Sequence, residues 1–302
     1  MAHHHHDTSK GLTLAFWLNL GFSIIEIIGG IFTNSTAIIA DAFHDFMDAF
    51  AIGAAVYLEK VAKKKRTSQF TYGYKRFSLL AAIGISITLL VGAVMMLTSG
   101  IKTFINPSEV NSVGMLWLAV LGLAINGFAF LKIKNGNTGH HAHSHAHSHS
   151  HNSKAIMLHL LEDVLGWAAV LIGAAVIYYT GWFWIDGVLA IGIALFIGYN
   201  ACKNLYETVK IVLQSVPENV DLKKLESDLN ATSGVKRIHD LHVWSLDGSY
   251  HLGSIHVVVD NPDEQLRSNL RGRLHKVMEQ HHIVHPTIQL EQPTEVCKLV
   301  NC

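Results

Sequence analysis

Six long runs of apolar residues occupy the first two-thirds of the chain. Each run has about 20 residues or more, which is the length that a helix needs to cross a hydrocarbon layer of about 30 Å. We therefore predict an all-α six-helix transmembrane bundle. Its spans are expected at residues 12–32, 37–58, 78–103, 113–133, 155–180 and 183–205.

The pattern changes to short amphipathic segments near residue 221. A helical segment comes first, followed by two stretches of alternating apolar residues, a second helical segment and a short final strand. This α-β-β-α-β order predicts a small α+β domain with its helices on one face of the sheet. The expected segments are 222–229, 235–246, 250–259, 263–281 and 287–290.

Composition and charge agree with a membrane part followed by a soluble part. The chain is 50% apolar and only 15% charged, and its formal net charge of +0 gives no support for a nucleic-acid partner. About half of the charged residues lie from Glu207 onward. We expect an N-terminal segment at 1–11, to whose His run we assign no function, a transmembrane domain at 12–206, and a soluble tail domain at 207–302, for which the family resemblance described below implies metal binding and dimerisation.

Basic residues are concentrated in the loops of one side of the predicted bundle. Because Lys and Arg favour cytosolic loops, we expect both termini, a His-rich loop at 134–153 and the tail to face the cytosol. The small multi-pass chain is expected in a bacterial inner membrane. The basic residues are Lys60, Lys63, Lys64, Lys65, Arg66, Lys75 and Arg76 after the second span, and Lys132, Lys134 and Lys154 around the loop after the fourth.

Two of the predicted spans carry a histidine and an aspartate four residues apart. His44 and Asp48 lie in the second span, and His159 and Asp163 lie in the fifth. Residues at this spacing share one face of a helix, and ionisable groups in a bilayer each cost about 2.5 to 3.5 kcal/mol. Two imidazoles and two carboxylates form a set that suits a tetrahedral Zn²⁺ ion. The alternative is that each pair is a structural hydrogen-bonded bridge between helices.

Other polar residues in the spans admit structural as well as metal-related roles. Asp41 lies on the stripe of His44 and either orients an imidazole or serves helix packing. Asp45 and Glu162 are expected to point away from the paired face. Structural hydrogen bonding is expected of Asn19, Glu26, Asn126 and Asp186.

Histidines are also frequent outside the spans. The segment from His140 to His151 alternates His with Ala and Ser, a composition that binds metal weakly and without fixed geometry. It either captures metal at the mouth of the bundle or is a solvated linker. The tail holds candidate ligands beside its strands: His239, His242, His251, His256, His281, His282, His285 and Glu291.

Three motifs together resemble the cation diffusion facilitator family, in its zinc-transporting CzcD-like branch. They are Ala40-Asp-Ala-Phe-His-Asp-Phe-Met-Asp48, His159-Leu-Leu-Glu-Asp163 and His239-Asp-Leu-His-Val-Trp-Ser245, with the His-rich loop between spans four and five. The resemblance implies a homodimer with a ferredoxin-like tail that exchanges cytosolic Zn²⁺ for protons. It places the transport site on His44, Asp48, His159 and Asp163, and a tail site on His239, His256, His285 and Glu291.

The chain departs from the family pattern at two places. Some members pair a basic residue after span two, here Lys75, with an acid at the end of span six, where this chain has Gln214. Others bind a second tail zinc through a Cys-x-x-Cys motif, whereas Cys297 and Cys302 have a wider spacing. The sequence therefore supports the tail site at His239, His256, His285 and Glu291 better than a second zinc site at Cys297 and Cys302.

The prediction that follows is a secondary-active efflux transporter, not an enzyme. It would export zinc, and also cadmium, cobalt or other transition metals, from the cytosol in exchange for protons, and zinc would also be a structural ion in the tail. An intramembrane zinc hydrolase is one alternative, but it needs an open coordination position and often a His-Glu-x-x-His helix, which this sequence lacks. A membrane-anchored metal sensor is the other alternative.

Overall fold

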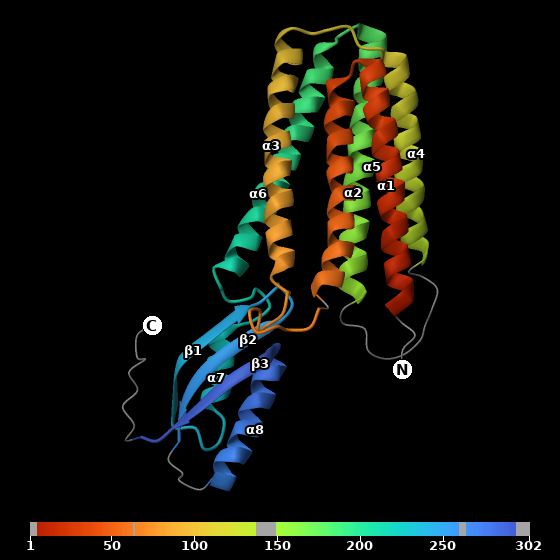
Figure 1. Cartoon of the computed structure of the whole chain (residues 1–302). Coiled ribbons are helices and arrows are strands. Elements are labelled where there is room, and N and C mark those ends of the chain that lie inside the picture. The colour runs from red at the N-terminus through yellow and green to blue at the C-terminus, as the bar shows by residue number, and fades with distance from the viewer. Residues whose placement is uncertain (1–4, 63, 137–148, 260–263, 294–302) are drawn as a thin grey trace. The chain divides into compact units, whose positions relative to one another are not determined.

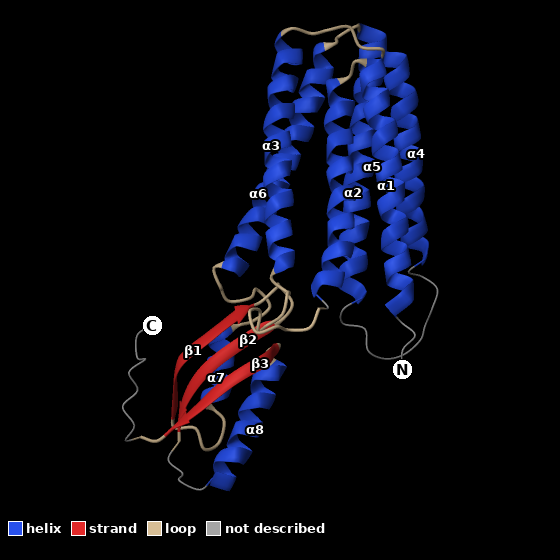
Figure 2. Cartoon of the chain, viewed as in Figure 1, coloured by secondary structure: helices blue, strands red, loops and turns tan. Residues whose placement is uncertain are grey.

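The computed structural model describes residues 5–62, 64–136, 149–259 and 264–293. The chain divides into two compact units, which are Met1–Tyr57 with Gly84–Lys203, and Leu58–Ile83 with Asn204–Cys302. Figure 2 shows that the strands belong to the second unit alone. Each unit is described by itself below.

Six long helices form at the six predicted apolar runs (Figure 1). Most extend past the predicted bounds by several residues, because polar residues continue a helix beyond the apolar stretch that reveals it. The helices are α1 His5–Thr33, α2 Thr36–Ala62, α3 Phe77–Ile105, α4 Ser112–Gly136, α5 His149–Thr180 and α6 Trp184–Val212.

By length and composition, three described segments are apolar enough to cross a membrane: α3, Leu161–Thr180 of α5, and α6. Shorter apolar stretches lie in α1 and α4, at Leu20–Thr33 and Ser112–Phe128. In α2, three aspartates in the middle of the helix lower the hydropathy. Large apolar side chains cover the outer surface of the helices, including Trp117 (73% exposed), Phe32 (81%) and Tyr179 (84%).

Two apolar clusters hold the helices together, and α2 contributes to both. Ile38 of α2 packs with Met115 of α4 and with Trp167 of α5. Further along α2, Met47 packs with Leu89 of α3 and Ile197 of α6. Gly122 of α4 permits the close approach of α5, because a Cβ at this position would lie 2.3 Å from the Trp167 ring.

The C-terminal part of the second unit confirms the predicted α-β-β-α-β order. Its elements are α7 Leu222–Asn230, β1 Arg237–Ser245, β2 His251–Val258, α8 Glu264–Gln280 and β3 Ile283–Glu291. Asp221 begins α7 by accepting a hydrogen bond from the Lys224 backbone N–H at 3.1 Å. The described strands form one sheet in the order β1-β2-β3, in which β1 and β2 are antiparallel and β2 and β3 are parallel.

Both tail helices cover the same face of this sheet. Leu225 and Leu229 of α7, and Leu274 and Met278 of α8, pack in one cluster with inward residues of the strands such as Ile255. Because side chains alternate along a strand, His256 lies on the opposite face. The cluster is built from residues between Val220 and Leu290, so the tail has an apolar core of its own. The uncovered face carries the polar residues described below.

Candidate metal sites

A cavity of about 360 Å³ lies among α2, α5 and α6 in the first unit. His44 and Asp163, two of the predicted zinc ligands, line it from α2 and α5. The rest of the wall is mostly apolar, including Leu189 and Phe196 of α6. A cavity with few polar groups in an apolar wall is the usual form of a small-ligand site.

The other two predicted ligands lie one helical turn from the first two. Asp48 follows His44 on α2, and its Oδ2 is 3.7 Å from His44 Nε2. His159 lies four residues before Asp163 on α5, and its side chain is outside the described part of the structure. The helices therefore carry both pairs at the predicted spacing, and the cavity joins His44 to Asp163.

Four neighbouring acids behave differently from one another. Asp41 lines the same cavity. Glu162, which was expected to point away from the paired face, lines it too. Glu26 of α1 is fully buried. Asp45 of α2 lies near enough to share a hydrogen bond with its carboxyl group, and Asp41 is close enough to repel it electrostatically. The expectation of a structural hydrogen bond at Glu26 stays a prediction.

Asp186 of α6 does have the predicted structural role. Its Oδ1 accepts a hydrogen bond from Ser35 Oγ at 2.5 Å, and its Oδ2 accepts one from the Thr36 backbone N–H at 2.7 Å. Ser35 Oγ in turn accepts from the Ile38 N–H at 3.2 Å. Since the first N–H groups of a helix lack intrahelical partners, Asp186 satisfies the start of α2 from another helix.

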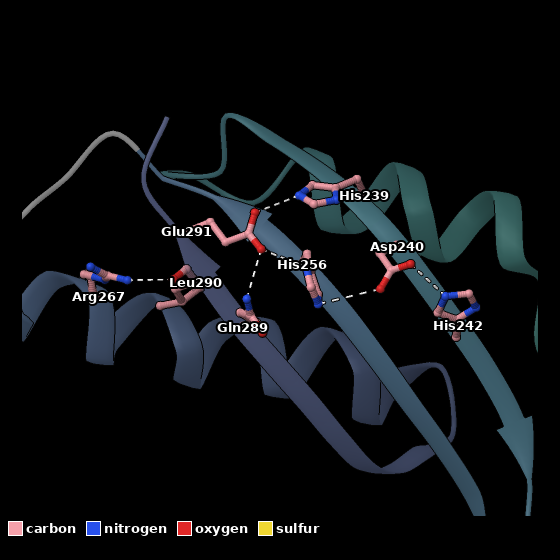
Figure 3. A network of polar contacts seen from close by, with 8 residues as sticks. All are labelled: His239, Asp240, His242, His256, Arg267, Gln289, Leu290 and Glu291. Carbon is pink, nitrogen blue, oxygen red and sulfur yellow. Dashed lines mark hydrogen bonds and ion pairs between the residues drawn. The ribbon is translucent and has the colours of Figure 1, made fainter. Parts of the chain in front are cut away.

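A second group of candidate ligands lies on the uncovered face of the tail sheet. His239 of β1, His256 of β2 and Glu291 of β3 converge, with one ligand atom of each within 4.8 Å of the others. Glu291 Oε2 is 2.9 Å from His239 Nε2, and Glu291 Oε1 is 2.7 Å from His256 Nδ1 (Figure 3). Two imidazoles and a carboxylate fit a zinc ion, which would replace the shared protons between them.

A β-bulge in β1 creates this arrangement. His239 pairs with His256 and His242 pairs with Ser254, so that Asp240 and Leu241 lie opposite a single β2 residue. On a regular strand His239 and His242 would face opposite sides, but the extra residue brings both to the face of His256. Asp240 takes a positive φ of 52°, which is uncommon for a residue other than glycine.

The bulge also places the Asp240 carboxylate beside two imidazoles. Its Oδ1 is 2.9 Å from His242 Nε2, and its Oδ2 is 3.7 Å from His256 Nε2 (Figure 3). On the far side, Gln289 Nε2 donates a hydrogen bond to Glu291 Oε1 at 3.1 Å. Sequence reasoning missed both roles. The sequence places Asp240 inside the His239-Asp-Leu-His242 motif, but this position brings its carboxylate near the imidazoles only because β1 has a bulge there.

Replacing Asp240 with asparagine is expected to weaken zinc binding by the tail by roughly 10- to 100-fold, the usual loss when a partner of a ligating histidine is removed. Asparagine tolerates the positive φ, so the backbone should be kept. The measurement is chelator competition on a fragment from residue 216 onward. The control is Asp228→Asn, which breaks a 2.8 Å contact with His281 away from the cluster. Equal affinities in the two variants would contradict a role for Asp240.

The fourth predicted tail ligand, His285, does not join the cluster within one chain. Parallel pairing sets His285 opposite Leu252 and sets Glu291 opposite Val258, at the other end of β3. Six residues of strand separate His285 from Glu291, or about 20 Å. The His285 ring instead packs near Tyr72 and Tyr250. Three of the four predicted residues thus converge within one chain, and ion binding by His285 stays a prediction. Sequence order does not reveal which end of a parallel strand meets its neighbour.

His251 is a buried tail histidine outside the cluster. Burial lowers the pKa of His251, the nearby His282 lowers it further, and Asp247 partly offsets this by raising it. The folded tail therefore keeps His251 neutral at a pH where the unfolded chain binds a proton. Folding stability should fall as the pH drops below about 6.5, the ordinary pKa of histidine.

We expect His251→Gln to reduce this loss of stability on acidification. The measurement is the thermal midpoint of the tail fragment between neutral pH and pH values below that of free imidazole. The thermal midpoint of the parent should fall more steeply than that of the variant as the pH is lowered. Parallel pH profiles would show that His251 does not titrate in folding.

Several predicted metal-binding segments lie outside the described residues. These are Cys297, Cys302 and most of the stretch from His140 to His151. Their roles stay predictions.

Comparison with known proteins gives the family. A family model described as "Cation efflux transmembrane domain" matches residues 12–213, and one described as "Cation efflux protein, cytoplasmic domain" matches residues 217–293. A solved metal-bound C-terminal domain of the CzcD transporter from Cupriavidus metallidurans is 36% identical, with a TM-score of 0.22, over 24% of this chain and 99% of its own.

Curated relatives match along nearly the whole chain. The "Cadmium, cobalt and zinc/H(+)-K(+) antiporter" of Bacillus subtilis is 32% identical over 96% of this chain and 92% of its own. The "Metal cation efflux system protein CzcD" of Cupriavidus metallidurans is 34% identical over 96% and 90%. The "Zinc transporter ZitB" of Escherichia coli is 30% identical over 96% and 93%. The chain is an integral membrane protein that belongs to the cation efflux, or cation diffusion facilitator, family, in its CzcD-like branch.

Proposed function

We propose that this protein exports Zn²⁺ from the cytosol in exchange for protons. The observation that carries the proposal is the cavity among α2, α5 and α6, which His44 and Asp163 line from separate helices. The relatives' names support it, since they describe efflux of cadmium, cobalt and zinc and an H(+)-K(+) antiporter. The family is one of transporters, so the hydrolase alternative is set aside.

The proposed transport site consists of His44, Asp48, His159 and Asp163. Two imidazole nitrogens and two carboxylate oxygens fill a tetrahedral shell and leave no position for a reactive water, which suits transient binding. Zinc is the substrate, and cadmium and cobalt are expected as secondary substrates. The imidazoles favour borderline metals over the harder Mn²⁺.

The proposed topology has six spans with both termini in the cytosol. The apolar outer surface of the helices supports it, and α2 becomes a span once its aspartates face the cavity and its neighbours rather than lipid. The basic loops support the orientation. We place the chain in a bacterial inner membrane, as a homodimer joined through the tail, whose family model is that of a dimerisation domain.

Proton exchange follows from the chemistry of the ligands. A histidine must be neutral to bind a metal ion, and a carboxylate must be ionised. When the site opens to a more acidic side, protonation of the histidines releases zinc and the emptied site returns with protons. Two aspartates that have lost the ion between them repel each other, which also favours uptake of a proton.

The test measures zinc uptake into proteoliposomes with an imposed pH gradient, together with the internal pH. We expect zinc movement to be accompanied by opposite proton movement. The double change His44→Asn with His159→Asn should remove both, while the helices remain inserted. Zinc binding with no flux would favour the membrane-anchored sensor, and zinc flux with no pH change would contradict proton exchange.

A further inference from the structure

The second unit contains a basic pocket of about 530 Å³ that no part of the transport mechanism uses. The loop from α2 to α3 contributes Lys64, Arg66, Tyr72 and Lys75 to it, and the tail contributes Tyr250 and His285. These six residues are called the basic pocket below. Three basic side chains thus share one concave surface.

Among the residues that the structure describes, no acid pairs with these cations. The residues that line the pocket include no Asp or Glu, and the described residues form no ion pair with Lys64, Arg66 or Lys75. The acid nearest in sequence to Tyr250 is Asp247. Its Oδ1 accepts hydrogen bonds from the backbone N–H groups of Ser249 and Tyr250, at 3.0 Å and 2.8 Å, so it serves the β1–β2 turn.

An aromatic ring, and not a carboxylate, holds Lys75. The Lys75 ammonium lies 3.6 Å from the centroid of the Tyr250 ring. A cation on an aromatic face keeps its full charge and its N–H donors. Since the described residues form no ion pair with Lys75, its charge stays available to an outside anion.

Hydroxyl groups complete the donor set. Tyr72 and Tyr250 carry phenolic O–H groups, and Tyr250 Oη lies 3.5 Å from His285 Nδ1. Cations together with hydroxyl donors are the chemistry that recognises a phosphate group. The volume exceeds what a small inorganic ion needs, and it leaves room for a phosphodiester with its glycerol substituent.

The surroundings favour a lipid as the source of that phosphate. The loop residues of the pocket immediately precede Phe77, where α3 begins. Helix α3 is apolar enough to cross a membrane. Phe70 is 41% exposed and Tyr72 is 53% exposed on the same loop, as aromatic residues at a membrane interface commonly are. Basic pockets on the cytoplasmic side of spans bind anionic headgroups.

We propose that the basic pocket binds the phosphate headgroup of an anionic phospholipid and that this lipid regulates transport. An occupied pocket joins the loop that follows α2, the helix of His44 and Asp48, to the tail strand β3 that carries Glu291. The headgroup neutralises the three basic side chains of the loop, which otherwise repel one another. The regulatory part rests on the proposed function, whereas the binding part does not.

The binding test uses the full-length protein in phosphatidylcholine nanodiscs with labelled phosphatidylglycerol and no zinc. Each basic side chain near a membrane surface contributes about fivefold in affinity, so Arg66→Gln with Lys75→Gln should weaken binding about thirtyfold. The matched control is Lys223→Gln with Lys224→Gln, which removes the same charge from the exposed surface of α7 and should leave binding unchanged. Lys75→Arg keeps the cation and should retain binding, which separates loss of charge from misfolding.

Equal losses in the pocket variant and the α7 control would overturn the proposal, because nonspecific charge would then explain the binding. Inorganic phosphate is the second probe. If it fills the pocket while phosphatidylglycerol does not, the lipid assignment is overturned. In proteoliposomes, phosphatidylglycerol should change the zinc flux of the parent but not of the pocket variant. Lipid binding without any zinc flux would contradict the proposed transport function but would still support the lipid site.

Discussion

Replacing Asp163 with alanine is expected to abolish zinc transport while the protein remains folded and inserted. Asp163 lines the cavity from α5, opposite His44 of α2. Its loss would remove one of two anionic ligands from the proposed four-ligand shell, so the ion would keep more positive charge in a surrounding of low polarity. The measurement is zinc uptake into proteoliposomes, with helix content from circular dichroism as the check on folding.

Glu162→Ala is the matched control for this change. Glu162 is adjacent on α5 and lines the same cavity, but it is not a proposed ligand. We expect it to alter the apparent affinity for zinc while turnover persists. If Asp163→Ala transports zinc normally, or if both variants lose transport equally, the assignment of Asp163 as a ligand is wrong.

Replacing Glu291 with glutamine should remove zinc binding by the tail. Glu291 contacts both His239 and His256, so its carboxylate is the centre of the cluster. The loss should exceed that of Asp240→Asn, because a ligand and not its supporting residue is removed. Zinc at about 100 times its dissociation constant stabilises the parent tail by about 2.7 kcal/mol, and this shift in the unfolding free energy should nearly vanish in the variant.

His285→Gln distinguishes the observed cluster from the four-residue set that the family resemblance implies. The structure separates His285 from Glu291 along β3, so this variant should bind zinc as the parent does. Isothermal titration of the tail fragment compares the two variants directly. A loss of zinc affinity in His285→Gln similar to that in Glu291→Gln would mean that His285 reaches the ion, for example across a dimer.

Much of the fold could be predicted because periodicity is local. Long apolar runs located the six helices, and alternation located β1 and β2. The start of β3 was missed because Val284, His285 and Pro286 lack a clear alternation, and only pairing with β2 makes them strand. Helical spacing also predicted the pairs His44/Asp48 and His159/Asp163, since four residues on a helix always share a face.

The tail site was only partly predictable, because it depends on register. His239 and His256 could be proposed from their residue types. That they face each other, with Glu291 and without His285, depends on how three strands pair, and Asp240 depends on one extra residue in β1. Glu26 is similar: its burial beside Asp41 and Asp45 depends on helix packing, which a sequence does not reveal.

The hydrogen bonds from Ser35 and Thr36 to Asp186 hold the N-terminal end of α2, so the rest of this helix can tilt about that end. His44 lies eight residues beyond Thr36, or about 12 Å along the helix axis. A tilt of about 10° around the fixed end would move His44 by about 2 Å, which is as long as a zinc–nitrogen bond. A small angular motion can therefore separate the ligands of the proposed metal shell while the hydrogen bonds at Asp186 stay intact, so release of an ion would not require the helices to separate.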